Sequence, residues 1–415
     1  MARNTDIDAD VLVVGGGLVG ASLAGVLAAS GVPTALVDRE DPEAVLKQSF
    51  DGRASAIAAG SRHMFEAVGL WDHVPECQPI HDIRVTDGRV GERPSPLSLH
   101  YDHRVVGEAM GHLVENRLLR AAQQNFLATE DNLHHIAPVD VARVIRRRGG
   151  AEARLKDGRR IRARLVAACD GRGSRLRSDA GIRTRRWQYD QSAIVTTLAH
   201  DRPHHGTAYE HFLPAGPFAM LPLPDADDGA HRSSIVWTET HAMARKVMDL
   251  DEAAFAREIL RRFGDTHGDV RRIAPRFRYP LSGLHADRYI DRRMALVGDS
   301  AHAIHPIAGQ GLNLGLRDVA ALAECIVDAR RLGLDVGAMD VLRRYQRWRR
   351  PDNLTLVAAT DSLDRLFSND LPPVRLARDM GLAAVNRMGP LKSVFMRHAM
   401  GMMGDLPKLV QGQPL

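Results

Sequence analysis

The sequence has few cysteines and little lysine. Its three cysteines, Cys77, Cys169 and Cys325, are odd in number and widely spaced. This pattern argues against a disulfide framework or a structural zinc site and is typical of a protein of the reducing cytosol. Only five of the 56 basic residues are lysine, so the positive charge is carried almost entirely by arginine.

No part of the chain concentrates charge of one sign. The formal net charge is +5, but 51 acidic residues are interleaved with the basic ones. Two arginine-rich clusters, at 146–148 and 347–350, are interpreted as solvated faces of helices or turns. The sequence therefore predicts no nucleic-acid-binding surface.

One stretch without charge, residues 11–37, is long enough to cross a bilayer. A signal peptide would place positive charge before such a stretch, whereas Asp6, Asp8 and Asp10 precede this one. Three consecutive glycines near its start and Pro33 near its end also disfavour a membrane helix. A buried segment of a soluble fold explains it better.

The same stretch predicts a βαβ unit that binds a dinucleotide. A β-branched strand is followed by the G-x-G-x-x-G pattern at Gly15, Gly17 and Gly20 and then by a small-residue helix. The glycines permit a tight turn and close approach to a pyrophosphate, which the helix N-terminus binds through its N–H groups. A second strand closes with Asp38, where a carboxylate accepts hydrogen bonds from a ribose diol.

Two later segments indicate that the ligand is long. After Asp38 the chain continues with a loop carrying Arg53 that leads into a helix, not with the further parallel βα units of a nicotinamide dehydrogenase. Strand-then-glycine signals recur at 164–177 and at 294–318. Distant segments of this kind suggest one extended ligand, and FAD has that shape.

The middle of the chain alternates like antiparallel strands, at 192–200, 206–214 and 231–240. We expect a sheet here that covers the flavin and binds the substrate. Within it, the expected apolar wall residues are Phe218, Met220, Leu221 and Leu223. Ordinary core packing is the alternative for some of them.

These motifs together resemble the flavoprotein aromatic hydroxylases of the para-hydroxybenzoate hydroxylase class, and within them the ubiquinone-biosynthesis hydroxylases. The resemblance runs from Asp8 almost to the C-terminus. It is carried by the βαβ unit and by "FDGRASAIA", "GHLVENRLLRAA", "CDGRGSRLR", "HFLPAGPFAMLPLP", "LVGDSAHAIHPIAGQGLNLGLRD", "YQRWRRPDN" and "LFSND". Ser300 departs from the pattern, since the family more often has alanine there, and this small change is expected to leave binding unaffected.

The resemblance implies an α/β fold with a Rossmann-like FAD-binding domain, an inserted antiparallel-sheet substrate domain and C-terminal helices. The expected FAD-binding domain is discontinuous and comprises 1–75, 105–185 and 285–335. The substrate domain comprises 76–104 and 186–284, and the helical region 336–415.

The resemblance also assigns site residues. Asp299 is expected to bind the ribityl hydroxyls, and Arg53 the pyrophosphate of FAD or an incoming nicotinamide cofactor, a surface arginine being the alternative. Asn116 occupies a position where relatives often carry arginine or glutamine, with an ordinary helix residue as the alternative. The full expected cofactor-binding set is Gly15, Gly17, Gly20, Asp38, Arg53, Asn116, Asp170, Asp299, Gly309, Gln310, Gly311 and Asn313.

Two histidines lie in the last glycine-rich motif. Their H-x-x-H spacing could suggest a metal, but no third ligand is near and none is expected. His302 is interpreted as a hydrogen-bonded structural residue. His305 and Pro306 are the candidate catalytic residues, the first facing the site and the second stiffening the loop beneath the flavin.

The implied activity is an FAD-dependent, NAD(P)H-consuming hydroxylation of the aromatic ring of a polyprenylated phenol in ubiquinone biosynthesis, with O2 activated as a flavin C4a-hydroperoxide. The alternatives are a hydroxylase of another small aromatic compound and an FAD-binding component of a multiprotein assembly with little activity of its own. Methionines and basic residues at 381–410 predict a surface that rests on anionic lipid or on another protein of the pathway, core packing being the alternative. The expected location is the cytoplasm, with peripheral membrane contact.

Overall fold

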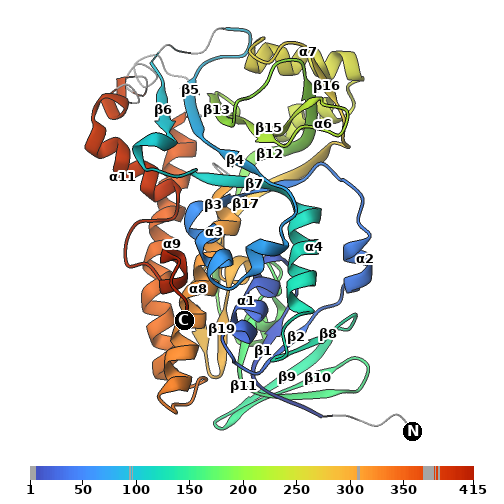
Figure 1. The fold of residues 1–415 in the computed structure, drawn as a ribbon, viewed down its shortest axis with the longest axis vertical. Helices are drawn as coiled ribbons and strands as arrows, with labels where there is room; N and C mark the ends of the chain where they lie inside the picture. The colour runs from blue at the N-terminus through green and yellow to red at the C-terminus, as the bar shows by residue number, and fades with distance from the viewer. Residues whose placement is uncertain are drawn as a thin grey trace.

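The computed structural model describes residues 6–92, 95, 97–305, 309–367, 378, 380–381 and 384–415. Two large sheets lie one above the other along the long axis, and the helices of the C-terminal part run beside both (Figure 1). No helix in these ranges is long and apolar enough to cross a membrane.

The lower sheet is built on the predicted βαβ unit. Over the described residues it has eight strands, in the order β18-β19-β11-β1-β2-β8 with the β9–β10 hairpin attached to β11. The pairs that join β19, β11, β1, β2 and β8 are all parallel. The strands are β1 (Ile7–Val14), β2 (Thr34–Val37), β8 (Leu133–Ile136), β9 (Val141–Arg147), β10 (Gly150–Leu155), β11 (Arg160–Ala168), β18 (Ile290–Asp291) and β19 (Met294–Leu296).

The upper sheet is antiparallel, as the alternation predicts, except for the parallel pair β13–β5. Its nine described strands follow the order β20-β17-β12-β15-β14-β13-β5-β6, with β16 paired to β12. They are β5 (Asp82–Asp87), β6 (Leu99–Asp102), β12 (Thr184–His200), β13 (Thr207–Leu213), β14 (Gly216–Leu223), β15 (His231–Thr240), β16 (Val270–Arg272), β17 (Phe277–Ala286) and β20 (His302–Ala303). The predicted α/β fold class is confirmed, whereas the exact domain boundaries stay a prediction.

A small sheet lies between the two large ones (Figure 1). It consists of β3 (Ala54–Ala58), β7 (Gly111–Glu115) and β4 (Gln78–Ile80) among the described residues. The sequence predicted that the loop at Arg53 leads into a helix. Helix α3 (Ala59–Ala67) follows as predicted, but the sequence did not indicate strand β3, which lies between the loop and the helix and pairs with β7.

Helices cover both large sheets. α1 (Leu18–Ala29) packs against α8 (Gln310–Arg331), and α8 against α9 (Met339–Phe367). The first contact is close, since a Cβ on Gly315 would lie 2.7 Å from a methyl group of Val19. The remaining helical elements are α2 (Pro42–Leu46), α4 (Asn116–Leu127), α5 (Arg175–Asp179), α6 (His241–Met248), α7 (Glu252–Phe263), α11 (Gly389–Ala399), η1 (Leu70–His73), η2 (His103–Val105), η3 (Gly298–Ser300) and η5 (Lys408–Gln411).

The segment after α11 returns to the lower half of the molecule. η5 packs against α3, and Leu409 and Val410 are fully buried in the same core as the parallel sheet. The backbone N–H of Gly60 donates to the carbonyl of Met400 at 3.0 Å. This segment is therefore part of the core that supports the N-terminal strands.

Candidate functional site

The turn between β1 and α1 brings backbone close to backbone. Gly15 has φ +100°, and a Cβ there would lie 2.5 Å from the carbonyl oxygen of Cys169. A Cβ on Gly20 would lie 1.8 Å from the carbonyl oxygen of Gly15. Gly17 differs, because a Cβ there would meet nothing within 4 Å, and as the N-cap of α1 it makes no side-chain capping bond. The first N–H groups of α1 thus face open space, which fits a pyrophosphate.

Two carboxylates flank this turn. Asp38 directly follows β2 and leans over the turn, since a Cβ on Gly16 would lie 2.3 Å from its Oδ2. Asp170 follows β11, and its Oδ2 accepts from the N–H of Leu176 at 3.2 Å. Its Oδ1 is buried and has no hydrogen-bond partner among the described residues. Acceptors beside a glycine turn at the carboxyl ends of parallel strands fit the hydroxyl groups of a dinucleotide.

Asp299 lies in η3, just after β19. Its carboxylate accepts from Arg172 Nε at 2.9 Å and is partly exposed. Ser300 next to it is fully buried, where its hydroxyl donates to the carbonyl of Ala168 at 2.6 Å and accepts from the N–H of Val297 at 2.9 Å. The family's usual alanine could not make these bonds, so Ser300 fastens the end of β11 to the turn that carries Asp299.

Beneath this turn lies a buried network centred on Asp318. Its carboxylate accepts from His302 Nε2 at 2.6 Å, Arg349 Nε at 2.9 Å, Asn353 Nδ2 at 3.0 Å and the N–H of Gly298 at 3.1 Å. Burial opposes ionisation, but His302 and Arg349 outweigh it and hold the pKa of Asp318 below its usual range. His302 is structural, as predicted.

This network shows that one arginine expected to be exposed to solvent is buried. The arginine-rich cluster at 347–350 was expected to be solvated, but the Arg349 side chain is only 2% exposed. Its guanidinium is satisfied by Asp318, Asp352 and Asn353. The available signal was the spacing of Arg349 and Asn353, which puts them on one face of a helix.

Arg53 and Asn116 lie together at the edge of the small sheet. Arg53 Nε donates to Asp51 at 2.7 Å, and its guanidinium lies 5.8 Å from the centre of the Phe277 ring. Asn116 Oδ1 accepts from the hydroxyl of Ser55 at 2.7 Å, and its backbone N–H donates to the carbonyl of Arg53 at 2.9 Å. Both side chains line the large cavity described next.

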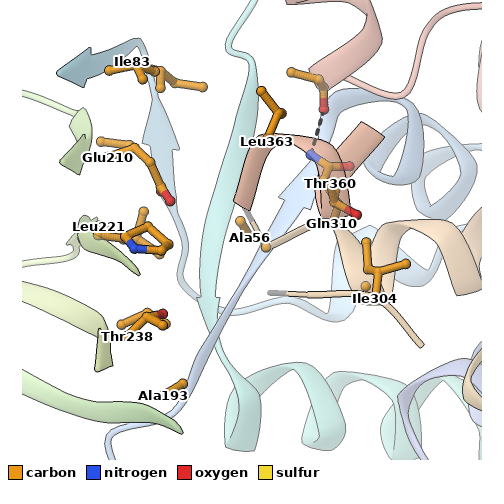
Figure 2. A pocket seen from close by; sticks show the side chains of 18 of the residues that line it. Ala56, Ile83, Ala193, Glu210, Leu221, Thr238, Ile304, Gln310, Thr360 and Leu363 are labelled. Carbon is orange, nitrogen blue, oxygen red and sulfur yellow. Dashed lines mark hydrogen bonds between the residues drawn. The ribbon is translucent and has the colours of Figure 1, made fainter. Parts of the chain in front are cut away.

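A cavity of about 1420 Å³ lies between the upper sheet and the helices. In Figure 2, Glu210 and Leu221 extend from the sheet wall, while Gln310 and Leu363 come from the opposite wall. The predicted cofactor residues that line it are Arg53, Asn116, Gly309, Gln310 and Gly311. Its volume exceeds that of a typical single-ligand pocket, so it has room for a flavin ring and a substrate together.

Only some of the residues expected to form the apolar wall of the cavity lie on it. Successive residues of a strand point to opposite faces, so only every second residue of β14 reaches the cavity. Leu221 lines it as predicted, together with Pro217 and Ala219. Phe218 and Met220 instead point to the other face, where they form a core with residues of α6 and α7. The alternation was visible in the sequence, but the face that meets the site was not.

The candidate catalytic histidine lies beside the cavity rather than on its lining. His305 is fully buried, with Nε2 at 3.2 Å from Gln191 Oε1 and its ring 5.0 Å from that of Tyr189. Burial lowers the pKa of His305 to about 4, so the ring is neutral near pH 7. A catalytic role for His305 stays a prediction. Pro306 lies outside the described residues.

Asn313 supports the site from within the protein. Its Oδ1 accepts from the N–H of Ala58 at 2.9 Å and from Ser61 Oγ at 2.9 Å, while its Nδ2 donates to the carbonyl of Ala56 at 2.8 Å. The amide therefore holds β3 against the start of α8.

The sequence did not predict the polar residues of the cavity wall, above all Glu210 and Thr238.

The site and fold define an FAD-dependent monooxygenase, a class that uses NAD(P)H as a transient reductant. The fold matches the crystal structure of p-nitrophenol 4-monooxygenase PnpA from Pseudomonas putida, with a TM-score of 0.78 over 97% of this chain and 100% of that one, at 19% identity. The sequence profile of the FAD binding domain family matches residues 8–357.

Two relatives show to which family of FAD-dependent monooxygenases the chain belongs. The chain is 51% identical to ubiquinone hydroxylase UbiL of Rhodospirillum rubrum, over 99% of this chain and 95% of that protein. It is 34% identical to 3-demethoxyubiquinol 3-hydroxylase of Escherichia coli, over 96% of this chain and 100% of that protein. The chain belongs to the family of FAD-dependent ubiquinone-biosynthesis hydroxylases.

Replacing Asp299 with alanine is expected to weaken FAD binding by about 1.5–3 kcal/mol, because it would remove the charge-assisted hydrogen bond expected between Asp299 and the ribityl chain. Titration of the apoprotein with FAD measures the change. Asp179→Ala removes an exposed carboxylate from the neighbouring α5 and serves as the control. A wild-type Kd in Asp299→Ala would mean that this turn does not contact the ribityl chain.

Replacing Arg53 with alanine is expected to slow flavin reduction at sub-saturating NAD(P)H by about tenfold, the effect of losing one charged contact. FAD should be retained, since the N-terminus of α1 is expected to bind its phosphates independently of Arg53. Stopped-flow reduction without oxygen gives the rate, with the exposed Arg104→Ala as control. An unchanged rate would make Arg53 a surface residue only.

Proposed function

We propose that this protein hydroxylates the aromatic ring of a polyprenylated phenol, a precursor in ubiquinone biosynthesis, at the expense of NAD(P)H and O2. The observation that carries the proposal is the cavity. It extends from the cofactor end, at Arg53 and Gly309, to α9 and α11, and apolar side chains form most of its lining. An aromatic head with an isoprenoid tail matches that length and polarity.

Bound FAD supplies the two-electron reduction by NAD(P)H and the activation of O2. The residues that would hold it are the glycines of the first turn with Asp38 and Asp170, and Asp299 with the start of α8. Gly309 is the N-cap of α8 with φ +63° and makes no side-chain capping bond. The first turn of α8 therefore offers N–H groups and the positive end of the helix dipole to an anionic group in the cavity. The apolar walls exclude water, which would otherwise divert the oxidant.

The test is turnover with a phenol that carries a short prenyl chain. The purified protein should contain about one non-covalent FAD per chain, oxidise NAD(P)H and give a ring-hydroxylated product. Hydroxylation of small phenols alone would indicate a different aromatic substrate. NAD(P)H oxidation without any hydroxylated product, in the presence of FAD, would favour a component of an assembly with little activity of its own.

We further propose that the cavity opens onto an apolar surface that rests on an anionic membrane. Leu363, Leu366 and Phe395 line the cavity and are also 40–44% exposed. Met388 and Val394 are exposed nearby, with Arg387, Lys392 and Arg397 along the same segment. A substrate dissolved in lipid could then enter the cavity without crossing water.

Part of the C-terminal segment that was expected to form a docking surface is buried in the core instead. Met396 and Met400 are fully buried and pack with Ala59 and Met110. Truncation after Gly381 is therefore an unsuitable test of docking, because it also removes the buried Leu409 and Val410. Point substitutions on the exposed face of α11 avoid this problem.

The double variant Val394→Glu/Phe395→Glu is expected to reduce co-sedimentation with anionic liposomes by at least about tenfold. The substitutions replace two apolar side chains that would contact the bilayer with negatively charged ones. Its FAD content and melting temperature should not change. Leu46→Glu, a similarly exposed leucine on α2, is the matched control. Full binding by the double variant would exclude this face as the membrane contact, and loss of co-purifying pathway proteins alone would reassign it to a protein partner.

A further inference from the structure

One acidic side chain stands in the middle of the apolar sheet wall. Cross-strand pairing puts Glu210 of β13 in a single row with Val85, Ala219, Val236 and Val195. All five residues line the cavity. Because side chains in one row of a sheet point to the same face, the Glu210 carboxyl is directed into the cavity, as Figure 2 shows.

The rows on either side are mostly apolar. One contains Ile83, Ala208 and Leu221, and the other contains Phe212, Pro217, Thr238 and Ala193. The acid Asp87, opposite Phe212, does not line the cavity and forms an ion pair with Arg378. Among the described residues that line the cavity, Glu210 is the one carboxylic acid. The charged groups nearest the cofactor end are arginines, and they lie outside these rows.

Glu210 is only 8% exposed. A buried carboxyl group needs hydrogen-bonding or charged partners, whereas alanine or valine would fit the row without any, as its neighbours do. A carboxylate has about four acceptor positions, so it can bind a ligand hydroxyl in addition to any protein donor. The cavity therefore contains a strong acceptor on its sheet wall.

Resting on the proposed function, we infer that Glu210 accepts a hydrogen bond from the phenolic hydroxyl of the substrate and so positions and selects the ring. The proton remains on the hydroxyl oxygen, and no bond is made or broken. A hydrogen bond to a carboxylate raises the electron density of the ring, which favours electrophilic hydroxylation. It also fixes which edge of the ring faces the start of α8 at Gly309–Leu312.

A comparison of a prenylated phenol with its methyl ether tests the contact directly, because the ether cannot donate. Binding is measured by the change in the flavin absorbance spectrum, without turnover. The wild type should bind the phenol about 10- to 100-fold more tightly than the ether, the range for a hydrogen bond to a charged group. In Glu210→Leu this preference should fall to about one.

Two further variants keep the inference open to refutation. Glu210→Gln retains shape and an acceptor, so it should show an intermediate preference even if Glu210→Leu does not fold. Thr238→Val tests the competing group, because the Thr238 hydroxyl is buried on the same wall and has no partner among the described residues. Glu66→Gln, which alters a surface ion pair on α3, is the neutral control.

The outcomes separate the inference from the proposed function. A preference that stays at the wild-type value in Glu210→Leu, or in Glu210→Gln if the former does not fold, overturns the assignment. So does a preference that disappears in Thr238→Val but not in the Glu210 variants. Failure of the wild type to bind any prenylated phenol refutes the proposed function, and the inference falls with it.

Discussion

Asp318→Ala is expected to lower the free energy of unfolding by about 3–5 kcal/mol, the usual cost of removing one partner of a buried ion pair. The substitution leaves the buried guanidinium of Arg349 without its main acceptor and removes the bond that orients His302. The N–H of Gly298, in the turn that carries Asp299, also loses its partner. Urea denaturation of the FAD-free protein measures the stability directly.

The same variant should bind FAD less well, because the turn at Asp299 loses its support. Asp340→Ala is a suitable control, since Asp340 is 91% exposed and pairs with Arg343 on the surface of α9. Wild-type stability in Asp318→Ala would mean that Arg349 finds another acceptor. In that case the network would not be what holds α9 beneath the site.

Two substitutions in the first glycine turn should differ in their effects on folding and on FAD binding. Gly20→Ala is expected to destabilise the protein by about 3 kcal/mol, because its Cβ would overlap the carbonyl of Gly15 and force the backbone apart. Gly17→Ala should leave the free energy of unfolding nearly unchanged, since its Cβ meets no protein atom. Its methyl group would instead occupy the space in front of α1, and purified Gly17→Ala should be largely colourless.

Melting curves of the apoproteins, together with the ratio of flavin to protein absorbance, separate the two effects. Gly149→Ala controls for the general effect of a glycine substitution, because its Cβ is also free of contacts and the residue lies in the β9–β10 connection. Normal FAD content in Gly17→Ala would contradict the assignment of this turn to the pyrophosphate.

The βαβ unit was predictable because strand, glycine turn, helix and acid are consecutive in sequence. The last glycine-rich motif was predictable for a similar reason, through its resemblance to a known family. Strand β3 was missed because its residues, from Ala54 to Ala58, are small and gain strand character only by pairing with β7. Local propensity contains no information about such a partner.

The cavity wall could not be predicted from any single motif. Glu210 and Val195 lie in one row only because β12, β15, β14 and β13 are paired in a particular register. Arg349 was misassigned for the same reason, since its acceptor Asp318 comes from another helix. Long-range pairing decides which side of an element is buried. It therefore determined the environment of Glu210, Val195 and Arg349, which the local sequence does not reveal.

The burial of Leu409 and Val410 in the core of the parallel sheet has a consequence for how the chain is made. The core that supports the N-terminal glycine turn stays incomplete until these residues have left the ribosome. Although the fingerprint of the cofactor site is synthesised first, that site can be completed only after Leu409 and Val410 have been made. We therefore expect the nascent chain to hold its flavin stably only once these two residues have joined the core.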